Sequence, residues 1–407
     1  MTATQIEQYL AQLDFVGNLE LLPPDAHLVG GSVRDAILNR SKTPWDLDFV
    51  VAKKAIATAR TIANFYQAGF VVLDQERDIA RVVFLQGTWD FALQAGKTIE
   101  EDLYRRDFTL NAIAYNLATQ QIIDPLNGLK DLQQGILRMV SSSNLEDDPL
   151  RLLRAYRQAA QLNLTIEETT RIAIRERTAQ LSAIAAERVQ AELNYLFTAP
   201  QGELWLTAAI EDGLLDYWLP SITPEKLKEL SRLKAGIDLA MDLGWDTAEL
   251  KVLSKLATLV ANDSTTAEAE LSQLKYSRAQ IKAVTKTVEY LPQLPSNINN
   301  LSLRKQYFWF LAVKDIFPLL MIRAIATGIT PEELRLAIHR YSNPKDPVVY
   351  PQPLVTGNDL MQELNLKPSR LIGELLTELQ IARIEAKIAT PQQAIDFAQT
   401  LLAQKTL

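Results

Sequence analysis

The chain has 407 residues, and at about 150 residues per domain this length predicts two or three domains. Hydrophobic residues make up 47% of the chain and charged residues 22%, which excludes a disordered or collagen-like protein. The 42 basic residues are outnumbered by 49 acidic ones, which gives a net charge of -7. Any binding of nucleic acid must therefore depend on a local basic patch.

The chain contains no cysteine and two histidines, His27 and His339. Disulfides, thiolate nucleophiles and cysteine-bound metals are therefore excluded. Metal sites need clustered ligands, so we expect both histidines to be packing or surface residues. The N-terminal residues are polar and acidic, unlike a signal peptide, and no apolar run approaches the roughly 20 residues that span a bilayer. We expect a cytoplasmic protein without membrane contact.

Residues 26–124 read as an α/β head, because short apolar runs of strand length are separated by turns and helical stretches. From about residue 147 onward, apolar residues recur at spacings of three and four, which predicts helices. We therefore predict an α+β fold: a head with a mixed sheet, followed by an extended all-α body. Strands are expected at 26–30, 45–51, 69–73, 79–85, 88–93 and 121–124, and helices at 150–162, 184–197, 204–215, 249–260, 307–317 and 371–387. Breaks at 141–149, 291–300 and 341–353 give expected domains of 1–140, 141–220, 221–342 and 343–407.

The first candidate site is the glycine pair of LVGGSVRD at 28–35. A strand leads into Gly30 and Gly31, and a helix is expected to begin near Ser32. Glycines allow backbone amides to approach a phosphate closely, and a helix N-terminus adds partial positive charge. For a bare glycine pair, an ordinary strand-to-helix turn is the commoner explanation.

Asp46 and Asp48 form the second candidate site, two residues apart in the expected strand WDLDFVV. Their carboxylates project from one face of the strand. Such acids repel each other unless a cation neutralises them, and Mg2+ is commonly held by one or two carboxylates together with substrate phosphates. An exposed strand edge is the alternative for an isolated pair, but this pair follows closely after the glycine turn.

Asp90 in the strand-like TWDFAL is a third acid of interest. Its side chain should lie on the opposite face from its apolar neighbours, together with Thr88 and Ala92. On a strand next to the acid pair it would complete a two-metal site, in which one ion activates an attacking hydroxyl and the other steadies a leaving pyrophosphate. An exposed strand acid is the alternative.

A charged segment, EEDLYRRDFTLNAIAYN, occupies 100–116. Arg105 and Arg106 offer forks of donors to a triphosphate, while Asp107 could accept a hydrogen bond from a ribose hydroxyl. A solvated helix face with local ion pairs is the alternative.

The segment DDPLRLLRAYR at 147–157 begins the helical body. Asp147 and Asp148 precede Arg151 by four and three residues, so we expect both acids on the arginine's face of one helix. An acceptor beside a fork of donors can read the Watson–Crick edge of a base. A simple salt bridge within the helix, worth about 0.3–0.5 kcal/mol, is the alternative. Two further arginines, Arg154 and Arg157, extend the basic row.

Taken in order, GGSVRD, DLD, RRDFTLNA, DDPLRLLRAYR and AERVQAEL resemble the five consecutive motifs of the class II tRNA nucleotidyltransferase and bacterial poly(A) polymerase family. The resemblance is strong over about 28–200, and the stretch 353–376 is similar to the family's tail. The head would therefore be a nucleotidyltransferase domain, 141–220 a base-recognition neck and 343–407 a tRNA-binding tail.

The resemblance implies Mg2+-dependent, template-independent addition of nucleotides to the 3′ end of tRNA, from CTP and with ATP left open. It places the triphosphate on Gly30, Gly31 and Ser32, the metals on Asp46 and Asp48, the sugar and phosphates on Arg106 and Asp107, and the base on Asp147, Asp148 and Arg151. Arg34, Asn111, Arg154 and Arg157 belong to the same expected nucleotide site, and Glu187 and Arg188 are expected to brace the base-reading helix.

Two departures from the family pattern bear on the product. The family usually has Glu-Asp before xxR, whereas Asp147 takes the place of the Glu here, with Glu146 one residue earlier. Only the short segment 91–104 separates Asp90 from the RRDF motif, where full CCA-adding members carry a longer flexible loop. We therefore expect CC addition, with CCA addition, A addition and poly(A) synthesis as alternatives. A non-catalytic RNA-binding protein is disfavoured because both acids of DLD are present.

Basic residues of the body are expected to bind RNA. Four of them recur at spacings of three or four and are predicted to lie on one helix, although a solvated surface helix explains them equally well. They are Lys275, Arg278, Lys282 and Lys286, and Arg304, Lys305 and Lys314 follow soon after.

Overall fold

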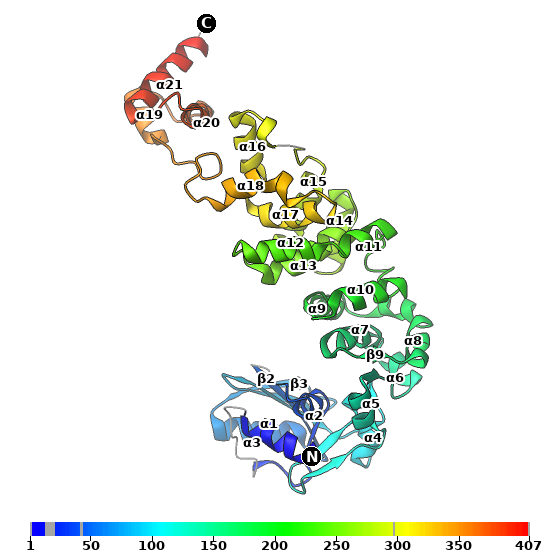
Figure 1. Cartoon of the computed structure of the whole chain (residues 1–407). Helices are drawn as coiled ribbons and strands as arrows, with labels where there is room; N and C mark the ends of the chain where they lie inside the picture. Colours follow the sequence, from blue (N-terminus) through cyan, green and yellow to red (C-terminus); the bar gives the residue numbers. More distant parts are fainter. Residues whose placement is uncertain (1, 13–20, 41–43, 296–297, 406–407) are drawn as a thin grey trace. The chain divides into compact units, whose positions relative to one another are not determined.

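The computed structural model describes residues 2–12, 21–40, 44–295 and 298–405 (Figure 1). The chain divides into two compact units, Met1–Tyr217 and Trp218–Leu407. Among the described residues, every strand lies in the first unit and the second is built of helices. The predicted fold, a head with a mixed sheet followed by a helical body, is confirmed.

Within the described part of the head, seven strands form one sheet in the order β3-β4-β5-β2-β1-β6-β7. β2 and β5 run parallel, whereas the other neighbouring pairs are antiparallel. The six expected runs all become strands, and one short strand, β6, was not expected. The strands are β1 (His27–Val29), β2 (Trp45–Val51), β3 (Gly69–Asp74), β4 (Ile79–Val83), β5 (Gly87–Leu93), β6 (Ala114–Asn116) and β7 (Gln121–Ile123).

The two faces of this sheet differ because side chains alternate along each strand. Trp45, Leu47 and Phe49 of β2 are buried in the main core of the head. Helices α1 (Thr2–Gln12), α2 (Gly31–Ile37) and α3 (Ala55–Tyr66) contribute residues to the same core. The acids Asp46 and Asp48 therefore lie on the opposite face, which these helices do not cover.

Between β5 and β6, and again after β7, the first unit contains short elements, and these lead into longer helices. α7 packs against both α9 and α10. α10 ends before Gly213, whose backbone is left-handed with φ of 80°, and this shortens the helix expected at 204–215. The elements are α4 (Ile99–Leu103), η2 (Thr109–Asn111), α5 (Gly128–Gln134), β8 (Ile136–Leu137), α6 (Ser142–Asp147), α7 (Leu150–Leu162), β9 (Thr165–Ile166), α8 (Glu168–Arg175), η3 (Thr178–Ala183), α9 (Ala186–Thr198) and α10 (Gly202–Glu211).

The second unit packs helix on helix. α12 approaches α17 closely at Gly236, where an added Cβ would lie 2.9 Å from the Cα of Ile322. The single helix expected at 307–317 was wrong: α16 ends at Val313, a 3-10 turn follows, and Pro318 lies in the first turn of α17.

The helices of the second unit are α11 (Pro224–Leu230), α12 (Leu233–Asp242), α13 (Thr247–Leu259), α14 (Ser264–Gln273), α15 (Arg278–Tyr290), η4 (Ile298–Asn300), α16 (Leu303–Val313), η5 (Lys314–Ile316), α17 (Phe317–Ala326), α18 (Pro331–Ser342), α19 (Gly357–Glu363), α20 (Arg370–Ile384) and α21 (Pro391–Lys405). The break expected at 291–300 includes residues 296 and 297, which lie outside the described residues. In the described part of the chain, no helix has both the length and the apolar character needed to span a membrane.

Candidate active site

The acid pair of β2 is fixed by the start of α2. The hydroxyl of Ser32 donates to the carbonyl oxygen of Asp46 at 3.1 Å and accepts from the backbone N–H of Asp48 at 3.0 Å. The Asp46 carboxylate accepts a hydrogen bond from the Thr88 hydroxyl on the neighbouring strand β5. Ser32 thus holds the backbone between the two acids, while Thr88 orients one of their carboxylates.

The carboxylates of this pair fit a divalent cation. Burial, followed by the negative charge of Asp46, raises the pKa of Asp48 to about 7, although the Arg106 guanidinium acts in the opposite direction. A hard divalent ion prefers carboxylate oxygens and would relieve this repulsion. Asp46 and Asp48 are therefore the residues that would hold a metal ion.

Gly30 makes room for an arginine beside the acid pair. Its φ is 68°, and an added Cβ would lie 2.9 Å from Nη1 of Arg106 and 3.7 Å from Oδ2 of Asp48. Nη2 of Arg106 also donates to Asp102 Oδ2 at 3.0 Å. A side chain at Gly30 would be strained by its backbone and would displace the guanidinium. Arg106 thus presents a positive charge next to the carboxylates, as a triphosphate site requires.

Asp90 lies on the neighbouring strand, as expected, and its Cα pairs with that of Asp48. Its carboxylate forms a bidentate ion pair with Arg81, whose Nε and Nη2 each donate a hydrogen bond at 2.7 Å. Among the described residues, no three histidine, cysteine or acidic side chains lie close enough together to hold a metal ion. The catalytic role of Asp90 stays a prediction, and sequence reasoning missed Arg81.

A buried polar network joins the head to α7 through Asp107. Asp107 accepts from Arg154 Nη2 at 2.9 Å and from Asn111 Nδ2 at 2.8 Å, while Arg34 Nη1 donates to Asn111 Oδ1 at 2.6 Å. Burial by itself would raise the pKa of Asp107, but Arg154, Asn111 and the Phe108 N–H outweigh it and hold the pKa at about 2. Asp107 is therefore a permanent negative charge at the junction of the head and α7.

Gln158 completes this network and was missed from the sequence. Its side chain is 1% exposed, and Oε1 accepts from Asn111 at 2.9 Å and from Arg34 at 3.3 Å. Arg34 and Asn111 are themselves buried. The structure therefore places these two predicted nucleotide ligands in the buried network around Asp107, where they are hydrogen-bonded to other side chains. Arg157, another predicted ligand, pairs with Glu192 of α9. The sequence did offer a signal for Gln158: it follows Arg154 by four residues, so both side chains lie on one face of the same helix.

The predicted helix face formed by Asp147, Asp148 and Arg151 was wrong. Asp147 is the last residue of α6, Asp148 has an extended backbone, and α7 begins only at Leu150. Pro149 restricts the residue before it to extended conformations, so the acids cannot belong to the arginine's helix.

The structure instead brings other groups to this junction. Asp148 Oδ2 accepts from Arg188 Nη2 on α9 at 2.8 Å, and Arg151 Nη1 donates to the carbonyl oxygens of Asn144 at 2.8 Å and Arg105 at 3.0 Å. Asp147 is exposed. Arg188 therefore holds the segment before α7, and the bracing of the base-reading helix by Glu187 and Arg188 stays a prediction. Arg151 ties α7 to the loop that carries Arg105.

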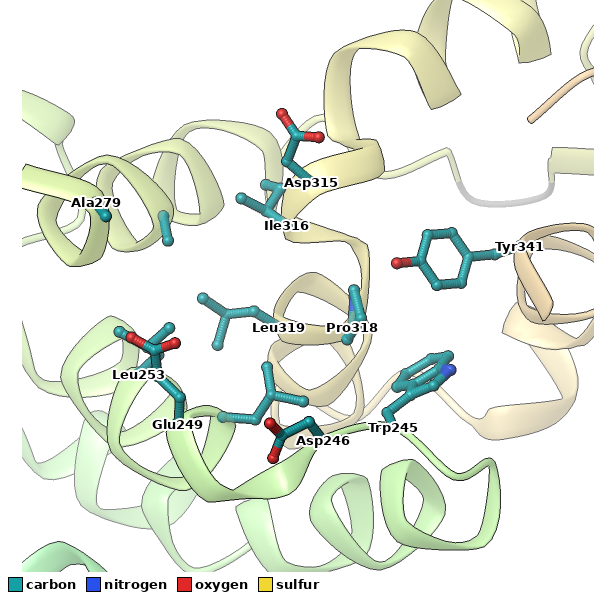
Figure 2. A pocket seen from close by; sticks show the side chains of 12 residues that line it. Trp245, Asp246, Glu249, Leu253, Ala279, Asp315, Ile316, Pro318, Leu319 and Tyr341 are labelled. Carbon is teal, nitrogen blue, oxygen red and sulfur yellow. The ribbon is translucent and has the colours of Figure 1, made fainter. Parts of the chain in front are cut away.

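The second unit contains a pocket of about 410 Å³ between α13, α15 and α17 (Figure 2). Apolar side chains such as Leu253 and Leu319 line it together with three carboxylates, Asp246, Glu249 and Asp315. Three carboxylates repel phosphate groups, so this pocket does not suit a nucleoside triphosphate.

The basic helix expected in the body is only partly present. Arg278, Lys282 and Lys286 lie on α15, opposite its buried residues Val284 and Val288. The fourth residue named with them, Lys275, precedes the helix in a left-handed turn with φ of 61°, so its placement on α15 was wrong. The helix begins later because Ser277 caps it and forms a capping box with Gln280.

Comparisons with known proteins define the class to which this site belongs. The poly A polymerase head domain matches residues 26–138, the probable RNA and SrmB-binding site of polymerase A matches 163–226, and the tRNA nucleotidyltransferase domain 2 matches 247–398. The chain belongs to the tRNA nucleotidyltransferase and poly(A) polymerase family, and it is a nucleotidyltransferase.

Several relatives are similar over nearly the whole chain, among them two tRNA nucleotidyltransferases. The CC-adding tRNA nucleotidyltransferase of Synechocystis sp. is 46% identical over 398 residues, covering 94% of this chain and 95% of the relative. The A-adding tRNA nucleotidyltransferase of Deinococcus radiodurans is 31% identical, covering 93% and 95%. The solved structure of the Thermotoga maritima CCA-adding enzyme complexed with tRNA has the same fold, with a TM-score of 0.76, 21% identity and 98% of each chain covered.

Proposed function

We propose that this enzyme transfers CMP from CTP to the 3′ end of tRNA, adds two cytidines and then stops. The observation that carries the proposal is the short connection between β5 and α4, residues 94–98. One CC-adding relative is 46% identical to this chain, which supports the same assignment, whereas a second CC-adding relative and the A-adding relative are each 31% identical.

The connection is held at both ends by hydrogen bonds. The backbone N–H of Gln94 donates to Val51 at 2.9 Å, that of Ala95 to the Asp102 carboxylate at 3.0 Å, and that of Lys97 to the Glu101 carboxylate at 2.7 Å. An added Cβ at Gly96 would lie 2.3 Å from Oε2 of Glu101. A change from cytosine to adenine needs an element with two arrangements, and this segment has little free chain to provide one.

The proposed chemistry is an in-line displacement at the α-phosphorus of CTP. The 3′-hydroxyl oxygen of the tRNA forms a bond to that phosphorus, its proton passes to solvent, and the bond to the β-phosphate breaks to release pyrophosphate. Divalent cations, Mg2+ in this proposal, would activate the hydroxyl and steady the leaving group in a two-metal arrangement. Asp46 and Asp48 would hold them, Arg106 would meet the triphosphate, and Gly30 and Gly31 would let backbone amides approach it.

The base of CTP is proposed to lie at the junction before α7. Asp148 offers acceptors and Arg151 offers donors there, which is the pair of functions that cytosine N4–H2 and N3 require. Arg188 keeps the Asp148 carboxylate in place. Asp147 is exposed at the same junction, and we retain it as part of the base site.

The test offers tRNAs that end before CCA, after C and after CC to the purified enzyme, with CTP and ATP supplied separately. Incorporation from CTP into the first two substrates and none from ATP into the third supports CC addition. Efficient use of ATP on the third substrate would favour an A-adding or CCA-adding enzyme, and repeated ATP addition a poly(A) polymerase. D46N and D48N serve as inactive controls because both carboxylates are proposed to hold the metal.

A further inference from the structure

Arg81 is a charged residue facing the proposed metal site from the strand beyond Asp90. The Cα of Arg81 pairs with that of Asp90 across β4 and β5, and the Cα of Asp90 pairs with that of Asp48 across β5 and β2. Paired residues on neighbouring strands project from the same face of a sheet. Arg81, Asp90 and Asp48 therefore form one row across three strands, with Asp90 in the middle.

Both oxygens of the middle carboxylate are committed to the arginine. Nε of Arg81 donates to Oδ1 of Asp90 and Nη2 donates to Oδ2, each at 2.7 Å. Such a forked, charge-assisted pair is among the stronger polar contacts in proteins. The hydrogen bond to Asp90 is the main cause that raises the pKa of Arg81, and the charges of Asp46 and Asp48 act in the same direction. The guanidinium thus lies within the field of all three acids.

We propose that Arg81 competes with the divalent cation for Asp90 and so weakens metal binding at the acid pair. While Arg81 holds both oxygens of Asp90, Asp46 and Asp48 are the two acids of this site that remain available as ligands. Breaking this contact would free a third carboxylate on the same face of the sheet. This inference rests on the proposed metal site and adds a residue that sets its affinity; Arg81 itself is a positioning residue that acts through Asp90.

The experiment measures Mn2+ binding to the full-length protein without nucleotide, by the loss of the free-ion EPR signal. The variants are R81Q, R81K, D90N and the double variant R81Q/D90N. R77Q is the matched control, because Arg77 lies on the turn before β4, is 81% exposed and pairs only weakly with Asp74 at 3.8 Å. Circular dichroism and thermal unfolding establish that each variant is folded.

R81Q is expected to bind Mn2+ about tenfold more tightly, because the change removes one charge-assisted hydrogen bond that competes with the ion. R77Q is expected to match the parent. R81K keeps the charge but loses the fork, so its affinity is expected to lie between those of the parent and R81Q. In the D90N background, the R81Q change is expected to have little effect on Mn2+ affinity, because the carboxylate for which Arg81 and the ion compete has been removed.

Unchanged or weaker binding in R81Q would overturn the proposal. Equal tightening by R81Q with and without D90N would also overturn it, since Arg81 would then act by general repulsion alone. D46N and D48N separate this failure from failure of the proposed function: if they leave Mn2+ binding unchanged, the metal site itself is misplaced, whereas if they abolish binding and R81Q has no effect, only the role of Arg81 is wrong.

Discussion

Asp48 carries an electrostatic cost, because burial and the charge of Asp46 both raise its pKa. It is half-buried, its neighbour Asp46 has the same charge, and Arg106 and Arg154 offset only part of this repulsion. A carboxyl with a raised pKa holds its proton more tightly in the folded state than in the unfolded chain, where its pKa is near 3.8. The site is therefore built at the expense of stability when no cation is bound.

This cost predicts a pH dependence for the metal-free protein. As pH rises from about 4 to about 7, Asp48 ionises in the unfolded chain before it does in the folded one, so the free energy of unfolding should fall by about 2–4 kcal/mol from this group. D48N should remove that part of the slope, whereas D242N, which changes an exposed acid on α12, should not. Denaturant unfolding in EDTA at several pH values measures how the free energy of unfolding depends on pH. Equal slopes for D48N and the parent would contradict the assigned repulsion.

Arg188 offers a second test at the residue scale. Loss of its bond to Asp148 should let the carboxylate turn away from the base, because Asp148 has an extended backbone and belongs to neither α6 nor α7. R188A should therefore reduce the preference for CTP over UTP by about tenfold, the value of one charge-assisted hydrogen bond. Competition between the two nucleotides measures the preference, with R77A as the control. A uniform fall for both nucleotides would show a structural role only.

At the scale of elements, one residue, Asp102, contacts both the connection between β5 and α4 and the active-site arginine, Arg106. Asp102 accepts from the backbone N–H of Ala95 and from Arg106. D102N should let Arg106 swing from its place over Gly30, so kcat/KM for CTP should fall by about tenfold to a hundredfold. E100Q, a neutralisation on the same helix, is the matched control for steady-state kinetics. Parent-like kinetics in D102N would mean that Arg106 is positioned by other contacts.

The sequence predicted most strands of the head because short apolar runs are separated by turns. It predicted the acid pair because every second side chain of a strand lies on the same face. It did not predict β6, whose residues are all buried and show no alternation. It also placed Asp147 and Asp148 on the wrong element, since spacing alone does not reveal that Pro149 separates two helices. The contact of Arg81 with Asp90 depends on which strands are neighbours, and the order of the strands is a property of the whole sheet.

At the scale of the whole molecule, a chain with a net charge of -7 must gather its RNA-binding charges locally. Reversing Arg278, Lys282 and Lys286 on α15 to Glu should weaken tRNA binding and reduce the slope of log affinity against log salt, because fewer counterions are released. The control reverses three exposed basic residues on other helices of the same unit, Lys228, Lys234 and Arg335. Filter binding at several salt concentrations gives both slopes, and identical slopes for the α15 variant and the parent would place the tRNA elsewhere.

Product length tests the central claim most directly. The enzyme is incubated with tRNA lacking its terminal CCA, with CTP and ATP present together, and the 3′ ends are resolved at single-nucleotide resolution over time. Because residues 94–98 are tied to Val51, Asp102 and Glu101, we predict that the product accumulates as tRNA ending in CC. A product ending in CCA, formed at a rate comparable to C addition, would contradict the account.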